Sequence, residues 1–165
     1  MNPQPMLLET HYFTKVAVEA NPSYRPKENE EELGGVQTEV QLAQHQDDPR
    51  RWQVILNIRT VAADETNLPY KIDLQAVGFF EIGPEVEEQR RPKIVHANGA
   101  AILYSSAREF LLLITGRGPW PALYLPTTNF LKPTKLKDDN EGEPTPPVPQ
   151  TIKKKRTSKT KSATD

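Results

Sequence analysis

The chain has 165 residues, which fits one domain with tails. It contains no cysteine, which excludes disulfides, thiolate zinc sites and cysteine nucleophiles, and its first residues lack the basic and apolar regions of a signal peptide, so we expect a cytoplasmic protein with no membrane span. The net charge of −1 hides an asymmetry, because residues 1–150 carry 15 Lys and Arg against 21 Asp and Glu, whereas residues 151–165 carry 6 against 1. Such a basic tail serves either solubility or a separate partner.

Alternation of apolar and polar residues predicts four strands. The first covers residues 12–19 and ends at Asn21-Pro22, and the polar connection that follows, up to Gly35, is long enough to cross the sheet. The second covers residues 36–42. The third and fourth, residues 52–59 and 70–82, each have one apolar face, which implies an antiparallel sheet with one solvated side. The residues expected inward are Trp52, Val54, Leu56, Ile58, Tyr70, Ile72, Leu74, Ala76, Gly78, Phe80 and Ile82.

A helix is predicted over residues 100–115. We expect Asn98 to cap its start and Gly116 to follow its end as a C′ glycine, with Pro119 preventing continuation. The helix is apolar on nearly all sides, and one sheet covers only one face of it. Leaving several aliphatic side chains in water would forgo several kcal/mol at roughly 25 cal/mol per Å². We therefore expect an oligomer with helices between sheets, and interface candidates Ile102, Leu103, Phe110, Leu113 and Ile114.

The composition changes after Phe130. The remaining residues contain five prolines and almost nothing to bury, and they end in a lysine-rich run. We expect an N-terminal arm over residues 1–10, a folded domain over 11–131, and a disordered tail over 132–165 that is proline-rich and then lysine-rich.

Residues 94–130 resemble the helix region of SecB-type export chaperones. Ala107-Arg108-Glu109 matches a triplet in the middle of the family's helix, Gly116-Arg117-Gly118 is similar to the step that ends it, and the leucine run at 123–125 with Asn129-Phe130 matches the segment beyond. Earlier in the chain, residues 12–15 are similar to the family's first strand and residues 77–80 to its fourth. The similarity spans about residues 12–131.

The resemblance implies an α+β fold in which a four-stranded antiparallel sheet packs on one long helix, and dimers that pair into a tetramer with the helices between the sheets. It implies a chaperone, not an enzyme, that holds unfolded polypeptides without nucleotide, metal or other cofactor. Family members serve protein export and dock to the translocase motor ATPase, whereas some SecB-like proteins guard the antitoxin of a toxin–antitoxin pair. Both roles stay open for this chain.

Departures from the family pattern bear on docking. One acidic position of the outer sheet face, which the family uses to meet the motor, is filled by Val16, whereas Glu19 and Asp73 match acidic positions and are the docking candidates. Typical members also continue with a second helix. Here Pro133 cuts that helix short, and the end of the chain is basic.

Aromatic side chains give the large, sequence-tolerant contact area that a promiscuous binder needs. Trp120 and Tyr124 lie between prolines beyond the helix, where client contact and burial are equally expected. Trp52 and Phe80 are expected in the core, and Phe79, on the polar strand face, is expected to contact another subunit or the crossing connection rather than a client. The candidates for a client groove are Trp120, Tyr124, Leu125, Phe130, Tyr104 and Phe79.

Other chemistry is not indicated. Arg108 and Glu109 are expected to form a buried or subunit-bridging ion pair, and the three histidines, His11, His45 and His96, have no metal-ligand spacing. The basic run at 153–156 has no interleaved aromatic residue, so specific nucleic-acid binding is not expected. The rival from another class is a small ligand-binding or enzymatic α+β domain that uses the crevice between helix and sheet.

Overall fold

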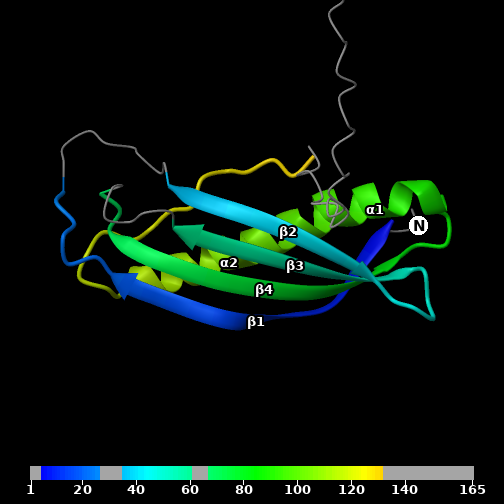
Figure 1. Ribbon diagram of the computed structural model, residues 1–165, viewed down its shortest axis with the longest axis horizontal. Coiled ribbons are helices and arrows are strands. Elements are labelled where there is room, and N and C mark those ends of the chain that lie inside the picture. Colours follow the sequence, from blue (N-terminus) through cyan, green and yellow to red (C-terminus); the bar gives the residue numbers. More distant parts are fainter. Residues whose placement is uncertain (1–4, 27–34, 61–66, 132–165) are drawn as a thin grey trace, which may run out of the picture.

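The computed structural model of the protein describes residues 5–26, 35–60 and 67–131. Within them lie the strands β1 (Met6–Ala20), β2 (Val36–Gln44), β3 (Arg51–Thr60) and β4 (Tyr70–Ile82). They form one antiparallel sheet in the order β1-β4-β3-β2, so the connection after β1 crosses the sheet as its length predicts (Figure 1). The tail predicted over 132–165 lies outside the described residues.

The inward faces of β3 and β4 agree with the prediction from alternation. Val54, Leu56 and Leu74 are fully buried, and the remaining side chains expected inward on these strands are buried with them. Burying this many aliphatic and aromatic side chains is the main favourable term in the stability of the domain. The α+β class and the antiparallel sheet are therefore confirmed.

The first strand is longer than expected. It begins at Met6, which pairs with Ile82, so the predicted arm over residues 1–10 contributes its last five residues to the sheet. The reason is packing, because Met6 and Leu8 contact the core. Register shifts next to Leu8 and Phe13 interrupt the simple alternation, as β-bulges do. Phe13 and Val18 therefore both pack against the core although they belong to opposite sets in the sequence pattern.

The helix is also longer than expected. It runs without a break through η1 (Glu88–Arg90), α1 (Arg91–Ile94), the π-helical turn η2 (Val95–Gly99) and α2 (Ala100–Thr115), 28 residues in all. The predicted cap at Asn98 is wrong, because Asn98 lies inside the π-helical turn and the backbone at Gly99 is helical. Pro92 stands in the first turn of α1, where proline is tolerated because its fixed φ suits a helix.

At its C-terminal end the helix stops at Thr115, as predicted, but not by the predicted device. Gly116 has φ −64°, so it is not the left-handed C′ glycine that was expected. The chain turns by short-range bonds in which the N–H of Gly118 donates to the carbonyl of Thr115 (3.0 Å). Gly118 itself must lack a side chain, because a Cβ there would collide with the hydroxyl of Tyr70.

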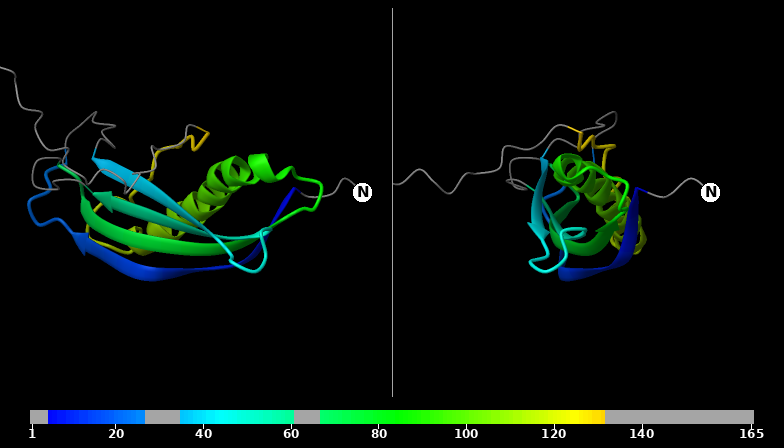
Figure 2. Two further views of the ribbon diagram at one scale, coloured as in Figure 1. Left: turned by 45° about the vertical axis from the view of Figure 1, so that its right-hand side comes forward. Right: turned by 90° about the vertical axis from the view of Figure 1, so that its right-hand side faces the viewer.

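The sheet curls around the helix, which lies against its inner face (Figure 2). The buried side of α2 consists of Ala100, Leu103, Tyr104, Ala107, Leu111 and Thr115. Helix and sheet approach each other closely at Gly99, where an added Cβ would be 2.8 Å from Cγ2 of Val54. Among the described residues, no helix is long and apolar enough to cross a membrane.

Candidate functional site

Residues 119–131, here called the return segment, run back along the helix without forming a strand (yellow in Figure 1). Side chains of the helix hold its backbone at successive points. The hydroxyl of Thr115 accepts the N–H of Leu123 (2.9 Å), the hydroxyl of Tyr104 donates to the carbonyl of Pro126 (2.8 Å), and Nδ1 of His96 is 3.1 Å from the carbonyl of Phe130. These bonds satisfy backbone groups that have no ladder partner, so the segment is fixed in place by side chains.

Tyr70 of β4 anchors the beginning of the return segment. Its hydroxyl lies 3.0 Å from the carbonyl of Thr115 and 2.9 Å from that of Trp120, and it accepts the N–H of Trp120 at 3.2 Å. The Trp120 ring packs edge-on against Tyr24, with 5.3 Å between ring centroids. Trp120 is therefore half-buried, with one side in contact with the body of the domain and the other open to solvent.

The other groove candidates divide into exposed and buried residues. Tyr124 is 63% exposed, so it presents a free aromatic ring. Tyr104, Leu125 and Phe130 are buried within this chain, and Phe130 packs edge-on against Tyr104. These three side chains fill the space between helix and return segment, so they are not open to a client. Sequence alternation could not separate them, since the segment has no regular secondary structure.

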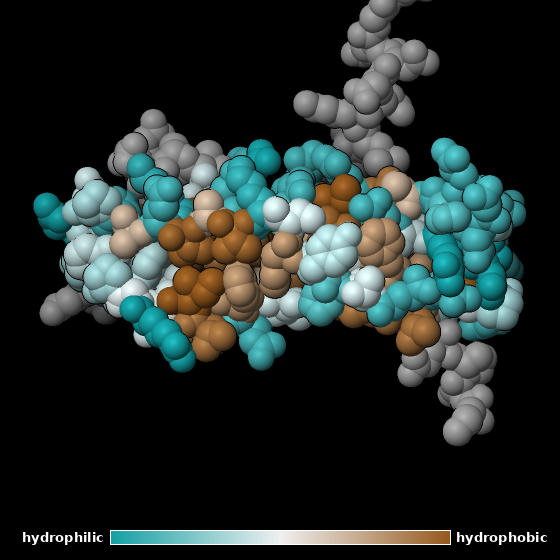
Figure 3. Space-filling view, turned by 90° about the horizontal axis from the view of Figure 1, so that it is seen from below, coloured by the Kyte–Doolittle hydropathy of each residue, from teal (hydrophilic) through white to brown (hydrophobic). Residues whose placement is uncertain are grey.

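A second surface lies along β1 and the outer side of α2. Leu113 is 61% exposed, Val16 47% and Ile102 38%, and the half-buried Phe13 and Phe110 stack between strand and helix with 4.5 Å between centroids. Figure 3 looks onto this side and shows apolar side chains gathered along its middle. Of the interface candidates, Ile102 and Leu113 are exposed, Phe110 and Ile114 are half-buried, and Leu103 is fully buried by the chain's own sheet, which removes it from any surface.

The two charged residues of α2, Arg108 and Glu109, are not part of its buried side. Arg108 and Glu109 are both exposed, so the predicted ion pair is not buried, and neither has an ion-pair partner among the described residues. A pair that bridges two subunits stays a prediction.

The outer face of the sheet carries the docking candidates. Asp73 is paired with Lys15 of β1 and with Arg59 of β3 (Nε to Oδ1, 3.2 Å). The hydrogen bond from Lys15, supported by the nearby charge of Arg59, holds the pKa of Asp73 below its usual value. Glu19 is exposed and lies opposite Lys71 in the register. The carboxylate at Asp73 is therefore already neutralised by two cations of the same face.

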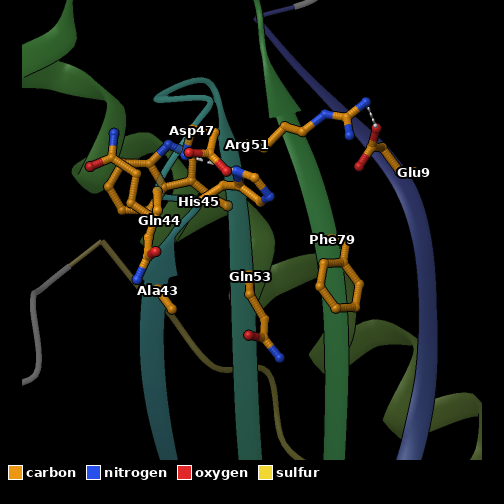
Figure 4. A pocket seen from close by; sticks show the side chains of 10 residues that line it. Glu9, Ala43, Gln44, His45, Asp47, Arg51, Gln53 and Phe79 are labelled. Carbon is orange, nitrogen blue, oxygen red and sulfur yellow. Dashed lines mark hydrogen bonds and ion pairs between the residues drawn. The ribbon is translucent and has the colours of Figure 1, made fainter.

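At one end of this outer face is an open hollow of about 390 Å³, shown in Figure 4. Phe79 and Gln53 point into it from neighbouring strands, and the ion pair of Arg51 with Glu9 (3.2 Å) closes one side. The turn at the other side is held by His45, whose Nδ1 accepts the N–H groups of Asp47 and Asp48. Phe79 is half-buried beside Tyr12 of β1 (6.2 Å between centroids), so it contacts its own sheet rather than the part of the crossing connection that the structure describes.

These arrangements offer little support for catalysis or metal binding. In the described part of the chain, no group of three His, Asp or Glu side chains could hold a metal ion. His11 and Ser106 are 3.0 Å apart, but no carboxylate among the described residues contacts His11 to orient it as a base. The described residues instead present surfaces with exposed apolar and charged side chains.

Sequence reasoning missed several residues that build these surfaces. Tyr70 was visible only as a member of an apolar strand face and Thr115 only as the last residue of the predicted helix, yet their hydroxyls fix the return segment. Tyr24 is an isolated aromatic residue after the first strand. Only the contact with Trp120, nearly a hundred residues away, gives it a role.

Comparison with known proteins gives a consistent picture. The family described as preprotein translocase subunit SecB matches residues 2–133. A similar solved structure is the Mycobacterium tuberculosis SecB-like chaperone Rv1957, in complex with a ChAD peptide from the HigA1 antitoxin. It is 16% identical, with a TM-score of 0.54, and the match covers 76% of this chain and 91% of that one. A Streptococcus agalactiae protein of unknown function matches more weakly, at 15% identity and a TM-score of 0.43 over 74% and 97% of the two chains.

Proposed function

The chain belongs to the SecB family, and on that premise we propose that it is a chaperone that holds unfolded polypeptides in the cytoplasm, without catalysis and without a cofactor. The observation that carries this proposal is Tyr124, 63% exposed on a segment whose backbone is fixed by Tyr70, Thr115 and Tyr104. A rigidly presented, solvent-exposed aromatic ring loses little entropy when it binds an apolar client segment.

The client surface that we propose consists of Trp120, Tyr124 and the neighbouring turn after α2. Aromatic contacts tolerate many client sequences because they depend on area rather than on a hydrogen-bond pattern. Weak contacts that exchange quickly let a client be released without nucleotide hydrolysis. Phe79, on the outer face, is a separate apolar element and supports client binding less, because Tyr12 already covers part of it.

We also propose that the surface of Val16, Ile102, Leu112 and Leu113 is covered by another copy of the chain. The support is the exposure of aliphatic side chains on strand and helix together, next to the unpaired charges of Arg108 and Glu109. A symmetric pairing of two such surfaces would bury the leucines and place each Arg108 near a Glu109 of the other copy. If the part on β1 and the part on α2 each contact a different copy, the assembly is a dimer of dimers.

Aggregation assays test the holdase proposal. An unfolded protein is diluted into buffer with the full chain, and light scattering is followed with and without ATP. We expect suppression that does not depend on ATP, that is largely lost in Tyr124→Ser, and that is retained in Tyr12→Ser, which removes an exposed tyrosine of the outer face instead. Suppression that is absent, or equal in the two variants, would contradict the proposal and favour the ligand-binding alternative.

Protein export is the role that we propose first, and guarding an antitoxin is the second candidate. The second is favoured by the state of Asp73, because Lys15 and Arg59 neutralise a carboxylate that would otherwise attract a basic partner. Binding of the purified translocase motor ATPase separates the two. Export predicts saturable binding that weakens in Glu19→Gln, whereas the antitoxin role predicts no binding to the motor and binding to an antitoxin peptide.

A further inference from the structure

A small groove lies at the other end of the return segment, beside Leu131. Its lining is Arg90, Lys93, Ile94, Ala97, Asn98 and Leu131, and its volume is about 220 Å³. We propose that this α1 groove binds a peptide segment in which acidic side chains alternate with apolar ones, supplied by another protein. The groove is smaller than typical sites for drug-sized ligands, so it fits a few side chains of an extended segment.

Its apolar part is open. Leu131 is 64% exposed at the rim, and the half-buried Ile94 and the buried Ala97 complete the apolar lining. Leu131 is fixed there because His96 contacts the carbonyl of Phe130 and the side chain of Asn129 accepts the N–H of Leu131. An apolar side chain of a partner could therefore pack against this lining, which the described part of the chain leaves uncovered.

Its polar part is cationic. On the sheet, Lys15, Arg50, Arg51 and Arg59 each form an ion pair, but Arg90 and Lys93 are exposed and form none within the described part of the chain. The acidic residues at the start of this helix are Glu87, its N-cap, and Glu88 in its first turn, and neither lines the groove. Two unpaired cations beside an apolar floor are complementary to a carboxylate that has apolar neighbours.

The shape of the helix at this point supports a binding role. Ala97 and Asn98 belong to the π-helical turn η2, and such turns are rare and frequent at functional sites. Here the wider turn buries Val95 and Gly99 while Asn98 is exposed in the groove, next to the cations. Its amide can donate to and accept from the backbone of an extended peptide.

This inference goes beyond the proposed holdase surface, because the α1 groove is lined by other residues and selects by charge. The test uses the full chain and two short labelled peptides, one with aspartate alternating with leucine and one with asparagine in place of each aspartate. Fluorescence anisotropy at low salt should show about tenfold tighter binding of the aspartate peptide. The preference should fall in high salt and vanish in Arg90→Gln/Lys93→Gln, while Arg108→Gln, a matched change on the same helix, should keep it.

Four outcomes would overturn the proposal. Equal binding of the two peptides, or a preference that survives Arg90→Gln/Lys93→Gln, would show that the groove does not recognise the carboxylates. Loss of the preference in Tyr124→Ser would place the peptide on the holdase surface, which leaves the proposed function intact. A preference that emerges only after Asp138→Asn/Asp139→Asn would assign the groove to the acidic run of the chain itself. Circular dichroism of each variant checks that it is folded.

Discussion

Both faces of α2 carry large aliphatic side chains, but only one face is covered by the chain itself. Leu103, Ala107 and Leu111 are fully buried against the sheet, whereas Leu113 and Ile102 remain exposed on the opposite side. Hydropathy alone does not separate these two sets, because leucine occurs in both. The difference shows that the helix is more apolar than one sheet can satisfy, and that the excess lies on one continuous side together with Val16 of β1.

The largest expected effect comes from the covered face. Leu111→Ala leaves a cavity in a site with no exposed surface, so it should lower the free energy of unfolding by about 2–5 kcal/mol. Leu112→Ala, at the neighbouring and partly exposed position, should cost less than about 1 kcal/mol. Urea unfolding at one protein concentration measures both. Equal losses would mean that the two faces do not differ as described.

On the open face, an introduced charge should weaken the association of copies and leave the fold of the protomer unchanged. Ile102→Asp/Leu113→Asp would bury two carboxylates in the proposed contact between copies, and association should weaken by about 100-fold or more. Sedimentation velocity measures the change. Tyr124→Asp is the matched control, since it places a carboxylate on the client surface. If that variant dissociated the protein equally, the contact would lie at the return segment instead.

A smaller effect is expected where the return segment meets the sheet. Tyr70→Phe removes the hydroxyl that contacts Thr115 and Trp120. Because the backbone groups of these two residues then lack this partner, the free energy of unfolding should fall by about 1–3 kcal/mol. Tryptophan fluorescence should shift as Trp120 becomes more exposed. Tyr24→Phe keeps the ring that packs on Trp120 and should change neither quantity. An unchanged Tyr70→Phe variant would show that packing alone holds the segment.

The smallest effect concerns the outer face. Because Lys15 and Arg59 lower the pKa of folded Asp73, the ion pairs contribute stability above the unfolded pKa, and this contribution is lost as the pH falls through the lowered folded pKa. Asp73→Asn should therefore cost less than about 1 kcal/mol at neutral pH, and nothing at a pH below that value, since the group is solvent-exposed. Unfolding measured across pH, with and without added salt, checks this. A difference that grows as the pH falls would have the wrong sign.

Most of the fold could be predicted from periodicity. The span of β4 and the C-terminal end of the helix match the prediction, because alternation and a glycine-proline stop are local signals. The start of the helix could not be predicted in this way, since residues 88–94 are mostly polar and include Pro92. The bulges in β1 were equally hidden, because they depend on the register with β4.

The candidate surfaces were less predictable than the fold. Tyr124 was predicted as a client-groove residue and Leu113 as an interface residue, and the side chains of both are exposed. Phe130, Leu125 and Tyr104 have the same chemistry but are covered by the return segment, whose course depends on contacts of Tyr70, Thr115 and His96. Ion pairs across strands, such as those of Asp73, cannot be recognised in a sequence pattern, because they depend on the register between strands.

Sedimentation equilibrium of the unmodified chain at micromolar concentration tests the central claim most directly. If the side formed by β1 and α2 is covered by further copies, the measured mass will be a multiple of the 18.7 kDa protomer. It should fall toward a single protomer only on dilution or in Ile102→Asp/Leu113→Asp. A stable 18.7 kDa species throughout that concentration range would contradict the claim.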